Sequence, residues 1–151
     1  MIKVLLLMVL LTTTVQAENY FTTVVGGTSI HIEDGYDDFD GTFKKFNNSH
    51  NLLGIEYRNN DYGLAVLRFE NSYFDTSYML TGSKYYQTKD YFEVIVSAGI
   101  VTGYTNRPAC IVALNTMCAI VAVGIQLDTP IFKPRITWYG TAFVLTLTME
   151  F

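Results

Sequence analysis

The sequence lacks an apolar run of the length that a membrane-spanning helix requires, which is roughly 18 to 20 residues. A much shorter apolar run follows Lys3 near the start of the chain. Val15 and Ala17 then fit the small-residue pattern that precedes a signal-peptidase cleavage point. We therefore predict a secretory signal peptide over 1–17 and one exported domain over 18–151.

Basic residues and histidines are also scarce. The chain has 10 Lys and Arg against 14 Asp and Glu, a formal net charge of -4 at pH 7. This balance argues against a nucleic-acid partner, which would favour a basic face. The two histidines, His31 and His50, lie far from both cysteines in sequence, so the chain has no metal-binding spacing. No metal or cofactor is predicted, and His50 is expected to be solvated.

Cysteine occurs only twice, at Cys110 and Cys118. Export would permit a disulfide between them without demanding one. The two residues would face each other across adjacent strands if the turn between those strands centres on Leu114. A disulfide and two free thiols both remain compatible with the sequence.

Helical periodicity is nearly absent, whereas segments with alternating apolar and polar residues recur between turn signals. Eight such segments are predicted as strands, at 27–33, 51–58, 63–70, 77–87, 91–103, 108–114, 117–127 and 140–151. Longer polar or proline-containing loops are predicted at 34–50, 71–76, 104–107 and 128–139. Short turns and long loops alternate, and eight is the smallest usual strand number of outer-membrane barrels. The pattern thus predicts an all-β fold, an eight-stranded antiparallel up-and-down transmembrane β-barrel.

Along each predicted strand, the charged residues and the large apolar residues occupy alternate positions, so the charges share one face and the apolar residues share the other. This parity predicts that the following side chains face the lumen: Glu56, Arg58, Arg68, Glu70, Glu93 and Glu150. A soluble secreted protein of the lipocalin or β-sandwich type, with its apolar face turned inward, would show the same parity. The aromatic last residue, Phe151, and the need of a membrane sheet for closure favour the barrel.

The closing stretch alternates strictly, with large apolar residues at every second position from Phe143 to Phe151. It resembles the C-terminal signal that outer-membrane barrel proteins present to their assembly machinery. The resemblance implies that the assembly machinery recognises Phe151 and inserts the exported chain into an outer membrane. We expect a monomer there.

Three stretches are similar to the lipid A palmitoyltransferases of the PagP type. They are "IHIEDGYDDFDGTFKKFNNSHNLLGIEYR" at 30–58, "YGLAVLRFENSYFD" at 62–75 and "VLTLTMEF" at 144–151. Members of that family are small eight-stranded barrels of the Gram-negative outer membrane. The resemblance implies transfer of a palmitoyl-type chain from a phospholipid to lipid A.

Residue by residue, His31 matches the family histidine and Ser72 the family serine, while Asn71 stands where the family has aspartate. Acyl transfer requires a base for the hydroxyl proton and donors for the oxyanion. The resemblance therefore makes His31 the candidate base and Ser72 a donor or orienting hydroxyl. Asn71 can donate or accept a hydrogen bond but supplies no negative charge, so Asp75 is the alternative helper.

Other interpretations of these residues stay open. His31 shares its parity with Ser29 and could belong to a polar network in the lumen. The family uses prolines near strand ends to open lateral routes for lipid, and Pro108 and Pro130 are predicted at such loop ends. The family helix before the first strand has no counterpart, because 18–27 is too short for it. A non-catalytic surface barrel of the phage or plasmid type is the alternative function.

Overall fold

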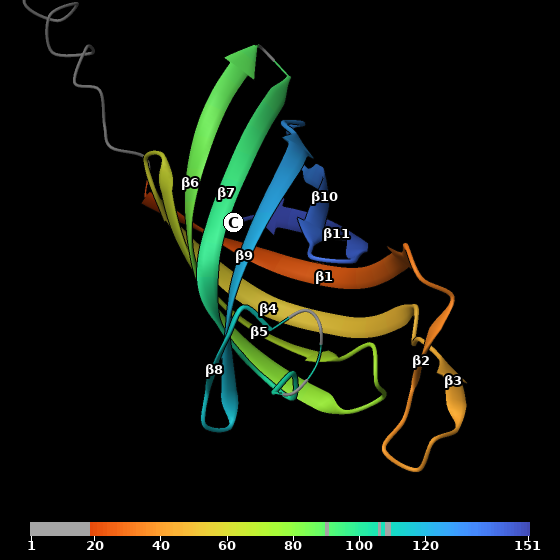
Figure 1. The fold of residues 1–151 in the computed structure, drawn as a ribbon. Helices are drawn as coiled ribbons and strands as arrows, with labels where there is room; N and C mark the ends of the chain where they lie inside the picture. Colours follow the sequence, from red (N-terminus) through yellow and green to blue (C-terminus); the bar gives the residue numbers. More distant parts are fainter. Residues whose placement is uncertain (1–18, 90, 106, 108–109) are drawn as a thin grey trace, which may run out of the picture.

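A computed structural model describes residues 19–151 apart from positions 90, 106, 108 and 109. The predicted signal peptide over 1–17 and Pro108 lie outside the described residues. Eight antiparallel strands form a closed barrel (Figure 1), which confirms the predicted fold class. The barrel strands are β1 (Asn19–His31), β4 (Ser49–Asn59), β5 (Tyr62–Glu70), β6 (Thr76–Lys89), β7 (Phe92–Thr102), β9 (Met117–Leu127), β10 (Phe132–Tyr139) and β11 (Ala142–Glu150). Within the described part of the chain, no helix is long and apolar enough to cross a membrane.

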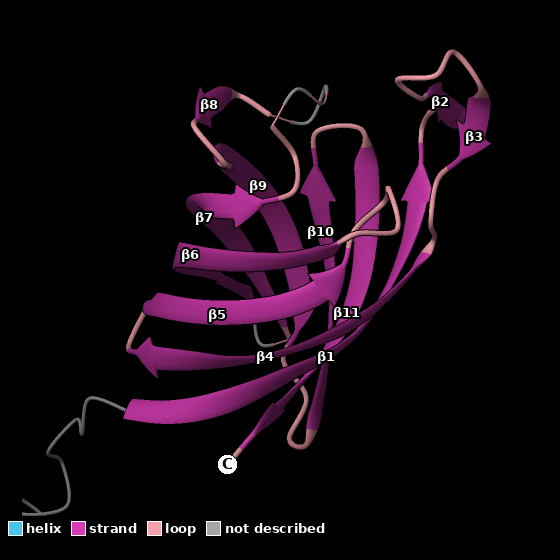
Figure 2. Cartoon of the chain, turned by 90° about the horizontal axis from the view of Figure 1, so that it is seen from below, coloured by secondary structure: helices cyan, strands magenta, loops and turns pink. Residues whose placement is uncertain are grey.

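The connections divide the barrel into two ends. The turns after β4, β6 and β9 lie at the end where β1 starts and β11 finishes, which we call the turn end. The connections after β1, β5, β7 and β10 lie at the opposite end, the loop end (Figure 2). Two of these connections contain short strands of their own: β2 (Gly35–Asp37) and β3 (Phe43–Lys45) after β1, and β8 (Val112–Leu114) after β7.

Two segments between 108 and 139 were wrongly predicted, although the number of barrel strands was right. The segment 128–139 was predicted as a loop and contains β10. Pro134 obscured this strand, but its missing N–H lies beyond the last residue pair that β10 makes with β9, which is Arg135 with Gln126. The segment 108–114 was predicted as a barrel strand and supplies only the short strand β8.

The first strand begins at Asn19 rather than at the predicted start, so the residues judged too few for a helix belong to β1. A register shift between Gly26 and Thr28 explains the error, because Gly26 and Gly27 adopt φ of 97° and 90°. Such a bulge inserts one residue and reverses the alternation. The pattern before the bulge therefore did not match the pattern after it.

The barrel is apolar outside and mixed inside. Glu56, Arg58 and Glu93 point into the lumen as predicted, with exposures of 1%, 6% and 6%. The prediction was wrong for Arg68 and Glu70, which lie on the outward parity of β5. The inward side chains of β5 are apolar and line the apolar half of the lumen. They are Ala65, Leu67 and Phe69.

The outward face carries a belt of exposed aliphatic side chains that a soluble lipocalin or β-sandwich would bury. Representative members are Leu53, Ile55, Leu64, Val66, Leu80, Val96, Val123, Ile125, Ile136 and Leu145. Such a belt is the surface that faces lipid in a transmembrane barrel. The apolar face is thus directed outward, as the barrel interpretation requires.

The lumen itself has two layers. Towards the turn end it is filled by buried ion pairs, in which Arg58 binds Glu93 at 2.9 and 3.0 Å and Arg135 binds Glu56 at 3.0 Å. Towards the loop end it is lined by a cluster of buried apolar side chains: Val24, Ala65, Leu67, Phe69, Met79, Val101, Cys118 and Ile120. The polar layer therefore forms a floor beneath an apolar chamber.

Candidate active site

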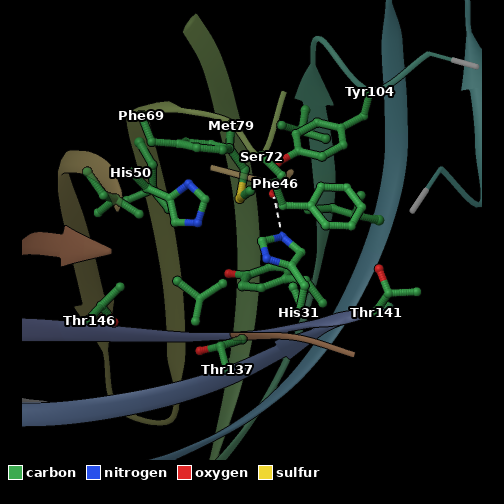
Figure 3. A pocket seen from close by; sticks show the side chains of 18 of the residues that line it. His31, Phe46, His50, Phe69, Ser72, Met79, Tyr104, Thr137, Thr141 and Thr146 are labelled. Atoms are coloured by element: carbon green, nitrogen blue, oxygen red, sulfur yellow. Dashed lines mark hydrogen bonds between the residues drawn. The ribbon is translucent and has the colours of Figure 1, made fainter. Parts of the chain in front are cut away.

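His31 and Ser72 meet at the loop end of the lumen (Figure 3). His31 is the last residue of β1, and Ser72 lies in the connection after β5. The imidazole Nε2 is 2.9 Å from the Ser72 hydroxyl oxygen. The Asn47 N–H donates to the Ser72 carbonyl at 2.9 Å, which fixes the backbone under the hydroxyl. The two residues that the resemblance identified are thus in direct contact.

The second ring nitrogen of His31 fixes the tautomer. Its Nδ1 lies 3.1 Å from the side-chain oxygen of Asn48, an atom that can only accept a hydrogen bond. Nδ1 therefore carries the proton, and Nε2 presents its lone pair to the Ser72 hydroxyl. The hydroxyl donates to Nε2, so Ser72, His31 and Asn48 form a hydroxyl–imidazole–amide series of the kind that activates a nucleophile.

Asn48 was missed by the sequence analysis because it belongs to a polar stretch of the predicted loop 34–50 with no distinguishing motif. The backbone explains its position: the Ser29 N–H donates to the Asn48 carbonyl at 2.9 Å, which brings the end of this loop beside the end of β1. Only this backbone pairing between β1 and the end of the neighbouring loop places the Asn48 amide next to His31.

Asn71 and Asp75 do not lie beside His31. The Asn71 side-chain oxygen accepts hydrogen bonds from the backbone N–H groups of Tyr73 and Asp75 at 2.9 and 3.0 Å. Its amide nitrogen donates to the Ser77 hydroxyl at 3.0 Å. Asn71 is fully buried, whereas Asp75 is exposed. Asn71 therefore shapes the connection that presents Ser72, because a short amide side chain readily bonds the backbone that follows it.

His50 forms a second buried imidazole next to the site. The prediction that it is solvated was wrong, because it is 4% exposed. Its Nδ1 lies 2.7 Å from the Glu70 carbonyl and must donate, so its Nε2 accepts from the Ser29 hydroxyl at 2.7 Å. The Ser29 oxygen is 3.5 Å from Nδ1 of His31. The two histidines are thus joined through one serine.

Aromatic side chains from the loops enclose the dyad. The Phe46 ring stacks on His31 with centroids 4.3 Å apart and planes at 15°. Tyr73 packs edge-on against Phe46, and Tyr104 against Tyr73. Burial raises the pKa of Tyr73 to about 12, and burial also raises the pKa of Tyr104, opposed by its hydrogen bond to Ser72. Both phenols therefore stay protonated at neutral pH and can donate hydrogen bonds.

Arg107 holds the loops over this aromatic group. Its guanidinium lies 4.0 Å from the ring centroid of Tyr73 and 5.1 Å from that of Tyr36. It also lies 3.9 Å from a carboxylate oxygen of Asp38, in the connection that contains β2 and β3. One cation thus ties three loops together, because aromatic faces and a carboxylate both attract it.

Below the dyad lies a cavity of about 100 Å³ that extends into the apolar layer of the lumen. Its walls include Val24, Leu52, Leu67, Phe69, Met79 and Val101. Arg135, which belongs to the charged network, lies at its floor. A narrow apolar chamber with one polar reactive pair at its mouth suits an alkyl chain that ends in an ester or a similar group.

The barrel wall is interrupted beside this cavity. β9 makes eleven residue pairs with β7 but only four with β10, from Val123 to Gln126. The cavity lining includes Val121, an exposed residue on the outward side of β9, together with Thr141 between β10 and β11. The cavity lining thus reaches the outer surface in the short gap along β9 between its last pair with β10, at Val123, and its first pair with β8, at Ala119. Pro130 lies in the turn at the other end of these strands, so the prediction that it marks the opening was wrong.

No model of a known protein family matches the chain, and no curated protein does. Solved structures do match. A designed transmembrane β-barrel, from work on the de novo design of such barrels, superposes with a TM-score of 0.56 and 16% identity over 88% of this chain and 95% of the other. The outer-membrane protein Ail of Yersinia pestis gives a TM-score of 0.41 and 13% identity over 89% and 100%. At such identities the likeness concerns the fold alone.

Two further features complete the site region. Cys110, which precedes β8, and Cys118, near the start of β9, form a disulfide, so of the two alternatives for these cysteines the disulfide is confirmed. In the part of the chain that the structure describes, no three His, Cys, Asp or Glu side chains converge as a metal-binding group. His31 and Ser72 can together perform proton transfer and nucleophilic attack.

Proposed function

We propose that the chain is an outer-membrane acyltransferase that moves a palmitoyl-type chain from a phospholipid to a hydroxyl of lipid A. One observation carries the proposal: a serine hydroxyl donates to a neutral imidazole, 2.9 Å away, at the mouth of an apolar chamber. An acyl ester is the substrate that uses both parts, because its chain is apolar and its carbonyl accepts a nucleophile.

In the proposed reaction, the Ser72 oxygen attacks the ester carbonyl of the phospholipid while His31 Nε2 takes the hydroxyl proton. The tetrahedral intermediate collapses, the glycerol oxygen leaves and His31 returns the proton to it, so the lysophospholipid departs. The acceptor hydroxyl then attacks the acyl group on Ser72, and the same proton transfers run through His31. Asn48 keeps the imidazole in the required tautomer but contributes no charge.

The donor lipid would enter through the opening between β9 and β10. The gap adjoins the outward belt, so in this proposal an acyl chain would pass from the membrane into the chamber without crossing water. The proposal includes the location that the sequence predicts. Export by a signal peptide over 1–17 and assembly through the C-terminal signal at Phe151 would deliver a monomer whose loop end faces the lipid A leaflet.

The test compares lipid A masses in a Gram-negative host that lacks its own palmitoyltransferase. The wild-type chain should add one palmitoyl mass, and His31→Ala should lower the transfer rate by about 10²- to 10⁴-fold, the usual contribution of a general base. Ser72→Ala should abolish transfer and also abolish labelling by a serine-reactive fluorophosphonate. Ser49→Ala is the matched control, because this serine is exposed on β4.

A folded chain that neither alters lipid A nor takes the label would refute the proposal and leave the non-catalytic surface barrel. Asn48→Ala separates the roles within the site. It should lower the rate without preventing labelling, because the hydroxyl and Nε2 remain while the tautomer is no longer fixed. Heat-modifiable gel mobility verifies folding of every variant.

A further inference from the structure

The connection that contains β8 has an unusual composition for a loop. The connection runs over 103–116; Arg107 is its only charged residue, and the stretch 108–116 contains no Asp, Glu, Lys or Arg. By contrast, the connection at 32–48 at the same end of the barrel contains five carboxylates and two lysines. A water-exposed loop gains nothing from a long uncharged apolar sequence, so the partner of the β8 connection is itself apolar.

The apolar side chains of this connection continue the outward face of β9. The register places Val112 opposite Ala119 and Leu114 opposite Met117. Residues directly opposite on antiparallel strands point to the same face, so all four lie in line with Val121. Val112, Leu114 and Val121 are 53%, 47% and 59% exposed. Figures 1 and 2 show β8 as a short arm beside the loop end of β9.

The outward apolar belt is shorter on β5, which β6 and β7 separate from β9 in the barrel wall. On β5 the outward apolar series ends after Val66, and the next outward residue is Arg68. Arg68 is exposed and forms no ion pair with any described residue. A charged side chain on a lipid-facing wall belongs at the headgroup level, since its cost falls towards the interface. The boundary of the hydrocarbon layer therefore lies closer to the turn end on β5 than on β9.

From this asymmetry we infer that the β8–β9 hairpin is embedded in the lipid leaflet, with Val112 and Leu114 among the acyl chains. The barrel sits deeper on its β9 side, which keeps Arg68 among the headgroups on the β5 side. The Cys110–Cys118 disulfide joins the segment before β8 to the start of β9, so the apolar face of β8 stays continuous with β9. This inference concerns the lipid contact and goes beyond the proposed acyl transfer.

Tryptophan fluorescence in vesicles tests the inference. Trp138 is the only tryptophan and lies exposed on the outward side of β10, so the wild-type chain is the lipid-facing reference. In a Trp138→Phe background, Leu114→Trp carries the probe on the hairpin. Phe39→Trp in the same background is the matched control, because Phe39 is 82% exposed in the charged connection. Each chain is reconstituted in phosphatidylcholine vesicles with plain or acyl-brominated lipid.

Bromine on the acyl chains should quench the Leu114→Trp probe to an extent comparable with native Trp138, and should leave Phe39→Trp unchanged. An unquenched, water-like emission would overturn the inference. An unquenched but blue-shifted emission with cross-linking to a dimer would overturn it as well, in favour of a second copy as the partner. If Leu114→Trp fails the gel-mobility test of folding, Val112→Trp replaces it. No outcome depends on acyl transfer.

Discussion

Removing one partner from the ion pair in the barrel floor should destabilise the protein severely. Arg58 donates two hydrogen bonds to Glu93, both side chains are buried, and Gln126 donates a third to the same carboxylate. Arg58→Met leaves the carboxylate buried with one donor. Loss of one partner of such a pair costs about 3 to 5 kcal/mol, or roughly 10²- to 4 × 10³-fold in the folding equilibrium.

The same reasoning predicts that a second substitution restores most of the stability. Glu93→Leu combined with Arg58→Met removes the uncompensated charge and fills the space with apolar atoms. The double variant should remain about 1 to 2 kcal/mol below wild type, because Arg58 also lies 3.6 Å from the ring centroid of Tyr85 and that cation–π contact is lost. Lys84→Met is the control, since its ion pair is exposed, and should leave stability unchanged.

Urea unfolding in lipid vesicles, followed by heat-modifiable gel mobility, gives the free energy of unfolding for each variant. The order of stability should be wild type together with the control, then the double variant, then Arg58→Met. Equal stability of the single variant and wild type would refute the reasoning. A double variant as unstable as the single one would do so too, because it would mean that packing rather than unpaired charge sets the cost.

Three further predictions concern the loop end. Asn71→Ala should cost about 2 to 3 kcal/mol and make 71–75 sensitive to protease, because two backbone N–H groups lose their buried acceptor; limited proteolysis checks this. Replacing Cys110 and Cys118 by serine should cost about 2.5 kcal/mol, the entropy of the short loop they close, measured by urea unfolding with and without reductant. The Tyr73 phenol has its pKa raised to about 12 by burial, so it favours the folded state below pH 10. That contribution should be lost as pH rises from about 10 to 12, which tyrosine absorbance titration of wild type and Tyr73→Phe would reveal.

Much of the candidate site was predictable because its two central residues sit in recognisable contexts. His31 ends an alternating segment and Ser72 begins a connection, so a family pattern could locate both. Asn48 had no such context, because its position beside His31 depends on pairing between β1 and the end of the loop before β4. Asn71 drew attention as a substitute for aspartate, but its side chain is used entirely by its own loop.

The sequence alone determined the fold class, the number of strands and the parity of most charges, because side-chain alternation along a strand is a local property with a period of two. Where a glycine bulge, as at Gly26 and Gly27, or a proline, as at Pro134, broke that period, the strand bounds were misjudged. Only the tertiary structure decided which strands part beside the cavity, why Arg68 points outward from the barrel and which amide holds His31. These depend on register and closure, which set neighbours across the barrel that no spacing along the chain encodes.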